Sequence, residues 1–171
     1  MENVFADVML AKLARWLRLA GMPVRDAPYT DDARLLGFVE RQGGVLLTSD
    51  EQLCARARKR GVRFVLLKQG RIEGQIALVA SALGVKVTTE PAKVCPVCGS
   101  KLVRIGRKKA RGLVPQVSYS RYRLFYFCRK CRKAYWHGTH WKRIRSRLAR
   151  SRAIQKKSHP RSGSPRALRP R

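Results

Sequence analysis

The N-terminal stretch NVFADVMLAKLARWLRLAG, residues 3–21, places an aspartate between a short apolar run and an amphipathic segment. The run from Val4 to Ala6 suits a buried strand, and the apolar residues that follow recur at helical spacing until Gly21, which can end the helix. Asp7 therefore comes directly after the predicted strand. Ligands bind at this edge of open α/β sheets, outside the carboxyl ends of the strands. The alternative is that Asp7 only caps the following helix.

The same order of strand and helix repeats through the first half of the chain. Further strands are expected around Val24 and in VLLTSD, RFVLL and VKVTT. Helices are expected in TDDARLLGFVERQGG, where Thr30 can act as the cap, and in EQLCARARKRG and IEGQIALVASALG. Alternating strands and helices predict an α/β fold with a parallel sheet. Because the crossovers are right-handed, successive strands should end at one edge of that sheet.

Acidic residues recur at this predicted edge. VLLTSD ends in Asp50, and Asp31 and Asp32 begin the next predicted helix after Asp7. Clustered carboxylates repel one another unless a cation lies among them, and oxygen ligands suit Mg²⁺ or Mn²⁺, which can activate water for phosphodiester cleavage. The simpler interpretation is that Asp31 and Asp32 compensate a helix dipole and that Asp50 caps a helix. The recurrence of these acids favours a metal site.

Charge is distributed unevenly along the chain. All ten Asp and Glu lie in residues 1–90 with 14 Lys and Arg, whereas residues 91–171 hold 25 Lys and Arg and no acid. Such a segment attracts polyanions, with nucleic acid favoured over an anionic membrane. The sequence contains neither a signal peptide nor an apolar run of about 18 residues. We therefore expect a soluble, cytoplasmic protein that does not contact a membrane; its oligomeric state is left open.

Four of the five cysteines form two C-x-x-C pairs, in CPVCGS and CRKC, separated by 29 residues. Four thiolates in such pairs are typical of a closed, structural Zn²⁺ site. The predicted ligands are Cys95, Cys98, Cys128 and Cys131. We expect a zinc ribbon over residues 91–143, with KLVRIG and SYSRYRLFYF as the strands of a hairpin that bears a long loop. Iron–sulfur or redox chemistry is the alternative, and Cys54 is expected to be an inert core thiol.

Aromatic residues and cations interleave near the second cysteine pair. His137 and His140 in YWHGTHW could serve as ligands or as a general base, but four cysteines already complete a zinc shell, which favours packing or surface roles. The aromatic residues can build a small core or stack on bases. The segment from residue 144 to 171 predicts a short basic helix followed by a disordered arm that binds RNA without reading its sequence.

The run ADVMLAKLARWLRLAG, followed by TDDARLL, VLLTSD, CPVCGS and CRKCRKAYWHGTHW, resembles the Mut-seven C-terminal ribonuclease domain family. That family joins a PIN-like nuclease domain to a zinc ribbon, and the resemblance covers residues 3–143. It implies that Asp7, Asp32 and Asp50 are the metal-binding catalytic acids, with Asp31 as the second candidate at the helix start. It also leaves open an RNA-contact role for the YWHGTHW segment.

These observations predict three units: a PIN-like nuclease domain over residues 1–90, the zinc ribbon over 91–143 and a basic, largely disordered tail over 144–171. The predicted function is that of a metal-dependent ribonuclease with structural Zn²⁺ and catalytic Mg²⁺ or Mn²⁺. Its partner would be RNA, with tRNA and ribosomal RNA as candidates. The alternative is a non-catalytic RNA- or ribosome-binding protein. The sequence leaves the RNA substrate, the cleavage position and the choice between endo- and exonuclease action open.

Overall fold

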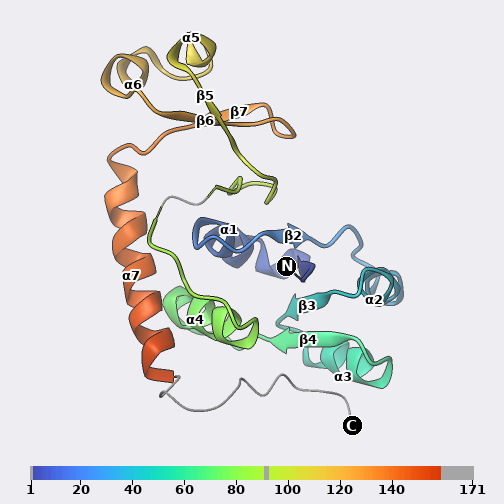
Figure 1. Cartoon of the computed structure of the whole chain (residues 1–171). Coiled ribbons are helices and arrows are strands. Elements are labelled where there is room, and N and C mark those ends of the chain that lie inside the picture. The colour runs from blue at the N-terminus through green and yellow to red at the C-terminus, as the bar shows by residue number, and fades with distance from the viewer. Residues whose placement is uncertain (1, 91–92, 159–171) are drawn as a thin grey trace.

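The computed structural model describes residues 2–90 and 93–158. An α/β domain comes first, a small β unit follows, and a long C-terminal helix runs back along the α/β domain (Figure 1). The elements of the α/β domain are, in chain order, β1 (Val4–Ala6), η1 (Val8–Leu10), α1 (Ala11–Leu19), β2 (Val24–Asp26), α2 (Asp32–Arg41), β3 (Val45–Thr48), α3 (Glu51–Lys59), β4 (Arg63–Leu66) and α4 (Ile72–Ala82).

The four strands form a parallel sheet in the order β2-β1-β3-β4. Side chains alternate across the strands, so that Ala6 and Leu47 face a core built with α1 and α4, whereas Phe5 and Leu46 face a second core built with α2 and α3. Both faces are therefore covered, as parallel sheets require. The predicted α/β fold with a parallel sheet flanked by helices is confirmed.

The segment VKVTT, which we expected to be the last strand, is not a strand in this structure. Backbone hydrogen-bonding groups of this segment pair with a side chain instead of with a neighbouring strand. Gln155 Nε2 donates a hydrogen bond of 2.6 Å to the carbonyl of Val85, and the Val87 amide donates one of 3.1 Å to Gln155 Oε1. Buried backbone groups need a partner of some kind, and here a helix side chain replaces the neighbouring strand.

The small β unit contains three antiparallel strands in the order β5-β6-β7. Its elements are β5 (Val103–Ile105), α5 (Arg107–Ala110), α6 (Gln116–Arg121), β6 (Phe125–Cys128) and β7 (Lys133–Tyr135). The expected hairpin with a long loop is present, but a third strand extends it, and SYSRYRLFYF divides into helix α6 and strand β6. Fully buried Phe125 packs against Ala110 and Val114, which holds the short helices on the sheet.

The last described element is α7 (His140–Ser158), which packs along α4 (Figure 1). Leu148 enters the core of the α/β domain, and the small buried Ser151 lies one helical turn further along α7. The expected basic helix at the beginning of the tail is present, and it extends to Ser158 because α7 has an apolar partner surface. The remaining part of the expected arm, residues 159–171, lies outside the described residues.

Candidate active site and metal centre

Asp7 lies between the end of β1 and the beginning of η1. It occupies the N-cap position of η1, yet its side chain makes no capping hydrogen bond. Instead, the Asp7 amide donates to the carbonyl of Leu47 at 2.9 Å, and the hydroxyl of Thr48 donates to Asp7 Oδ2 at 3.0 Å. The carboxylate therefore contacts the neighbouring strand β3, which argues against a role limited to helix capping.

Asp50 is connected to Asp7 through the same threonine. Thr48 is fully buried, and its hydroxyl oxygen also accepts a hydrogen bond of 3.1 Å from the Asp50 amide. Asp50 Oδ1 in turn accepts from the amides of Gln52 (2.7 Å) and Leu53 (3.0 Å), which caps α3. The helix-cap interpretation of Asp50 is thus correct, and the cap holds its carboxylate at the edge of the sheet where Asp7 lies.

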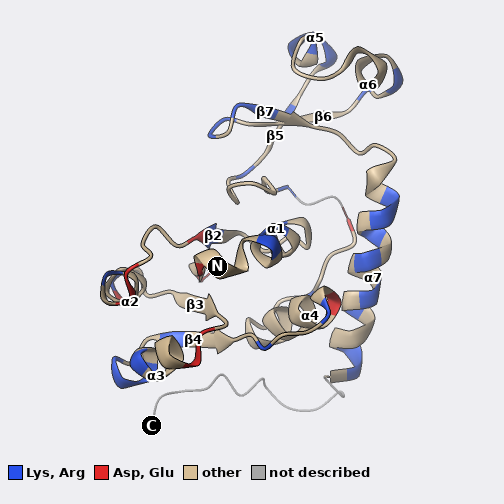
Figure 2. Cartoon of the chain, turned by 180° about the vertical axis from the view of Figure 1, so that it is seen from behind, with Lys and Arg blue, Asp and Glu red and all other residues tan. Residues whose placement is uncertain are grey.

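The two acids at the beginning of α2 have separate partners. Asp31 is the N-cap, since its Oδ1 accepts a hydrogen bond of 2.9 Å from the Arg34 amide, and the expected capping role of Thr30 is wrong. Asp32 Oδ2 lies 2.8 Å from a guanidinium nitrogen of Arg56 on α3. Acidic colour marks the beginnings of α2 and α3 in Figure 2. The ion pair joins these two helices and balances the charge of Asp32.

The structure therefore brings Asp7 and Asp50 into one hydrogen-bonded network and leaves Asp32 outside it, in an ion pair with Arg56. Within residues 2–90 and 93–158, the four cysteines are the one group of three or more candidate metal ligands that lie within 4.8 Å of one another. The catalytic assignment of Asp7, Asp32, Asp50 and Asp31 stays a prediction. Sequence reasoning missed Thr48 and Arg56, although Thr48 precedes Asp50 by only two residues.

The four cysteines meet between the two knuckles of the β unit. The Sγ atoms of Cys98 and Cys128 are 3.6 Å apart, and those of Cys95 and Cys131 are 3.9 Å apart. Four sulfurs about 2.3 Å from a tetrahedral Zn²⁺ would be separated by about 3.8 Å. The sulfur geometry thus fits Zn²⁺, and the predicted ligand set forms a cluster that could hold such a metal.

Neighbouring groups set the ionisation of these thiols. Burial alone would raise the pKa of Cys98, but hydrogen bonding with Ser100 and with the other cysteines outweighs it and lowers that pKa to about 6. Hydrogen bonding with Cys98, followed by burial, raises the pKa of Cys131 to about 12. Ionisation of the Cys98 thiol is thus favoured, whereas ionisation of the neighbouring Cys131 thiol is disfavoured. A divalent cation removes that conflict, because it favours the thiolate form of every ligand.

A buried arginine joins the cysteine centre to the α/β domain. Arg18 has a side chain only 3% exposed, and it donates to the carbonyls of Val24 and Val97 and to Asp26 Oδ1. Gly99 permits the close approach, since a Cβ there would lie 2.6 Å from the Val24 carbonyl oxygen. Sequence reasoning missed Arg18, although it lies four residues after Ala14 on the apolar face of α1.

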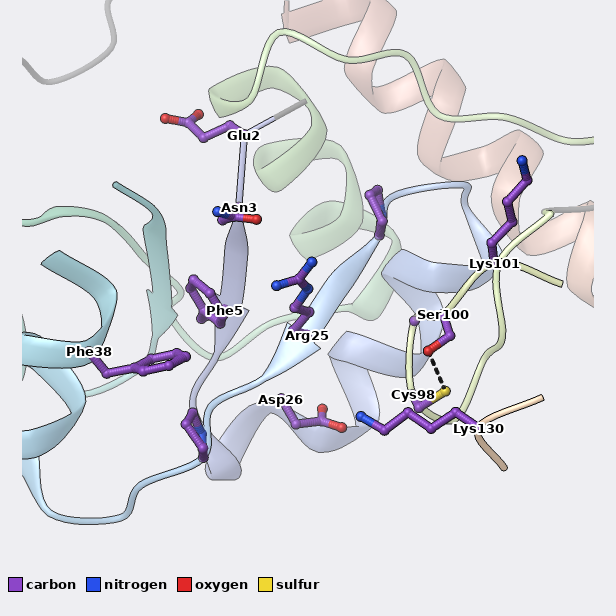
Figure 3. Close-up of a pocket in the computed structure, with 13 residues that line it drawn as sticks. Glu2, Asn3, Phe5, Arg25, Asp26, Phe38, Cys98, Ser100, Lys101 and Lys130 are labelled. Atoms are coloured by element: carbon purple, nitrogen blue, oxygen red, sulfur yellow. Dashed lines mark hydrogen bonds between the residues drawn. The ribbon is translucent and has the colours of Figure 1, made fainter. Parts of the chain in front are cut away.

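A cavity of about 620 Å³ lies between strand β2 and the cysteine-containing end of the small β unit. Figure 3 shows Arg25 and Asp26 on the strand side and Ser100 and Lys130 on the cysteine side. Asp7 and Asp50 are not among its lining residues, and the cavity is therefore separate from the network of acids at the sheet edge.

The two histidines do not join the cysteine cluster. His137 packs between the rings of Tyr126 and Trp141, with centroid separations of 5.3 and 5.2 Å, and burial lowers its pKa. His140 is exposed at the beginning of α7. These positions agree with the packing and surface roles that the sequence favours. Cys54 is a buried thiol whose pKa is raised by burial, in agreement with an inert core residue.

The parallel sheet with acids at its carboxyl edge, followed by a small β unit with four clustered cysteines, defines an α/β protein with an appended unit that could hold a metal. A comparison with family models agrees: the model described as Mut7-C RNAse domain matches residues 2–148. The chain belongs to this family, which confirms the resemblance seen in the sequence. No curated protein and no solved structure matched the chain.

Family membership indicates a ribonuclease-like function and implies RNA as the substrate class. The structure adds one observation about membranes. Within the described part of the chain, no helix combines the length and the apolar composition that a bilayer crossing would need.

Proposed function

We propose that this protein is a metal-dependent ribonuclease that cleaves RNA at the carboxyl edge of its parallel sheet. The observation that carries the proposal is the hydrogen-bonded network in which Thr48 joins the Asp7 carboxylate to the Asp50 amide. The residues fit a hard cation. In the hydrogen bonds among described residues Asp7 uses only Oδ2 and Asp50 only Oδ1, so each keeps one oxygen for Mg²⁺ or Mn²⁺.

Each residue of the network has a distinct part in this proposal. Asp7 and Asp50 hold the cation, and the buried Thr48 hydroxyl orients the Asp7 carboxylate toward it. Asp32, with Asp31 as the second candidate, would be the third acid to hold the cation, and it is paired with Arg56 in this structure. A bound cation supplies charge stabilisation for the phosphate and lowers the pKa of a water that attacks it.

The remaining units support RNA binding in this proposal. Residues 91–143 form the zinc ribbon with structural Zn²⁺, residues 144–171 form the basic tail, and residues 1–90 form the PIN-like domain. The ribbon and tail carry 25 Lys and Arg without an acid, which suits the phosphates of an RNA such as tRNA or ribosomal RNA. Activity on cellular RNA would place the protein in the cytoplasm.

The Asp7→Asn variant tests the catalytic part of this proposal. It preserves the shape of the side chain and removes its charge, so we expect Mn²⁺-dependent RNA cleavage to be abolished while the fold is retained. Relief of repulsion between carboxylates should leave the metal-free melting temperature equal or slightly raised. Cleavage is measured on mixed RNAs with and without Mn²⁺, and circular dichroism reports the fold.

Glu40→Gln is the matched control, because it removes one acid from an exposed ion pair with Arg60 at the far end of α2. It should cleave as the parent does. If Asp7→Asn cleaves RNA as fast as the parent at saturating Mn²⁺, the proposed site is wrong. A parent protein that binds RNA but neither binds Mn²⁺ nor cleaves would instead be the non-catalytic RNA-binding alternative.

A further inference from the structure

A groove lined by cations lies between α1 and α7, and its volume is about 910 Å³. The Lys and Arg residues that line it come from both helices: Lys12, Arg15, Lys142, Arg143, Arg147 and Arg150. No acid is among its lining residues. Figure 2 shows Lys and Arg along the length of α7 and at the beginning of α1.

Helical spacing explains why these cations share one surface. On α7, Arg143, Arg147 and Arg150 follow one another at intervals of four and three residues, beside the stripe that Leu148 anchors in the core. On α1, Lys12 and Arg15 are three residues apart and exposed. Tertiary packing therefore holds like charges side by side, an arrangement that a polyanion would stabilise.

The groove also has an aromatic wall. Trp16 of α1 lines it, and the guanidinium of Arg147 lies 5.1 Å from the centre of the Trp16 ring. Trp16 also packs against the core, so its ring holds Arg147 in place while the cations of the groove remain available to contact phosphates. Leu19 and Ile144 also line the groove, but its cations come from both helices and no acid lies among them, which favours the regularly spaced phosphates of a nucleic acid strand.

The groove continues toward the proposed catalytic edge. A neighbouring hollow of about 760 Å³ shares Lys12, Arg147 and Arg150 with it and extends to Arg71, with Glu73 as its one acidic lining residue. Arg71 lies between β4 and α4, at the carboxyl edge of the sheet, and Lys12 follows Asp7 by five residues. Cations therefore extend from the side of α7 to the edge that holds the acids.

We propose that this groove binds the phosphodiester backbone of the RNA substrate and directs the strand to the acids at the sheet edge. The inference rests on the proposed ribonuclease function. It assigns part of the RNA affinity to the α/β domain as well as to the basic C-terminal half of the chain. The α/β domain supplies one wall through Lys12 and Arg15, so binding is not confined to residues 91–171. Arg147 and Arg150 have a second role, because both also contact Glu73.

The test compares two double variants of the full chain. Lys12→Ala with Arg15→Ala removes two exposed cations from the groove, and Arg41→Ala with Lys59→Ala removes two exposed cations from α2 and α3. Binding of a fluorescein-labelled single-stranded RNA is measured by anisotropy without added divalent metal. We expect the groove variant to bind about tenfold more weakly, and its slope of log affinity against log salt to fall by about 0.7 for each phosphate that the variant no longer neutralises.

The control pair should change affinity by no more than about twofold, because screened charges on another face act weakly. Equal losses of RNA affinity in the two double variants would overturn the proposal, since they would indicate that RNA responds to the overall positive charge of the protein and not to the groove. If the groove double variant fails to fold, the RNA affinity of the single variant Arg143→Ala, from the opposite wall of the groove, is compared with that of the control double variant instead. Competition of RNA by phosphatidylserine vesicles that depends on Lys12 and Arg15 would also overturn it in favour of a membrane surface.

Cleavage assays separate this inference from the proposed function. If the parent cleaves RNA and the groove variant cleaves with an unchanged KM, the groove is wrong and the ribonuclease stands. If the groove variant loses binding but the parent never cleaves with Mn²⁺, the groove stands and the ribonuclease is wrong. With both correct, KM should rise about tenfold while kcat changes little, because Lys12 and Arg15 do not hold the cation.

Discussion

At the residue scale, single polar side chains connect parts of the chain that are far apart in sequence. Thr48 joins the ends of β1 and β3 through one hydroxyl, and Arg18 joins α1, β2 and the first cysteine knuckle through one guanidinium. Both side chains are buried, so each of their hydrogen bonds replaces water that the fold excludes. Removing the Arg18 guanidinium would leave the buried Val24 carbonyl without its donor, and removing the Thr48 hydroxyl would leave Asp7 Oδ2 without its donor.

Thr48→Val tests the orienting role of the hydroxyl. Valine has nearly the same shape, so the variant should stay folded and be destabilised by about 1–2 kcal/mol for the unpaired Asp7 oxygen and Asp50 amide. We expect Mn²⁺-dependent cleavage to fall about tenfold or more, because the Asp7 carboxylate loses its orienting partner. Thr48→Ser restores the hydroxyl and should recover most of the activity. A Thr48→Val enzyme as active as the parent would contradict this role.

At the element scale, the β unit and α7 are held in different ways. The β unit has two small clusters, one made of the cysteines with Leu102 and one around Phe125. The sheet of the α/β domain has its own two cores, which contain none of these residues. Helix α7 depends on the α/β domain, since Leu148 belongs to that core and Glu73 of α4 contacts two of its arginines.

Cys128→Ser should therefore unfold the β unit and leave the α/β domain intact. The variant removes one of four proposed Zn²⁺ ligands, and the free energy of metal binding is what supports so small a core. Limited proteolysis should cut residues 93–135 first, and elemental analysis should show loss of zinc. Cys54→Ala, a change at a thiol of the α/β core, should keep its zinc. Parent protein purified without chelators that contains no zinc would disprove this prediction.

The docking of α7 should weaken in acid. Burial would raise the pKa of Glu73, but hydrogen bonds from the backbone and Arg150 and the charge of Arg147 lower it overall. Because the folded-state pKa lies below the unfolded one, the carboxylate stabilises the fold above its ordinary pKa of about 4.3. This contribution disappears as the pH falls through the folded-state value.

Glu73→Gln should lower the melting temperature at neutral pH by about 2–4 °C for each kcal/mol of stability removed. The difference between parent and variant should shrink below about pH 4 and vanish once the parent carboxylate is protonated. Thermal melting followed by circular dichroism between acid and neutral pH measures both curves. Glu40→Gln is the control, since its exposed ion pair should give little difference at any pH. A constant gap between parent and Glu73→Gln across the range would contradict this account.

At the scale of the whole molecule, acidic and basic residues lie in different parts of the chain, and the two parts have different proposed functions. The acids all lie in residues 1–90, where Asp7 and Asp50 share the sheet edge, and the excess of cations lies in residues 91–171. Helix α7 runs back along the α/β domain (Figure 1). Some of its cations line the same groove as Lys12 and Arg15. One molecule thus combines a compact acidic edge with an extended basic surface.

RNA affinity should therefore depend steeply on salt. We expect log affinity to fall linearly with log salt, because each bound phosphate releases counterions. Removing residues 159–171 takes away four arginines and should make the slope less steep, by about 0.7 for each phosphate of a single strand that those arginines neutralise. The truncation ends after Ser158 so that Gln155 and its hydrogen bonds to Val85 and Val87 are retained. Binding that does not respond to salt would contradict this prediction.

The sequence by itself determined the features that depend on local patterns. Apolar runs such as VFA and VLL predict buried strands, helical spacing predicts α1 to α4, and two C-x-x-C pairs predict a cluster of four sulfurs, all of which the structure contains. The placement of Asp7 and Asp50 at one edge followed from the parallel order of the strands.

Only the tertiary structure decided the features that depend on partners distant in sequence. The conformation of VKVTT rests on Gln155, about 70 residues away, and the extension of the predicted basic helix to Ser158 rests on the surface of α4. The pairing of Asp32 with Arg56 likewise depends on how α2 and α3 pack. Periodicity records which face of an element is apolar, but it does not record which surface will cover that face, and long-range packing makes that choice.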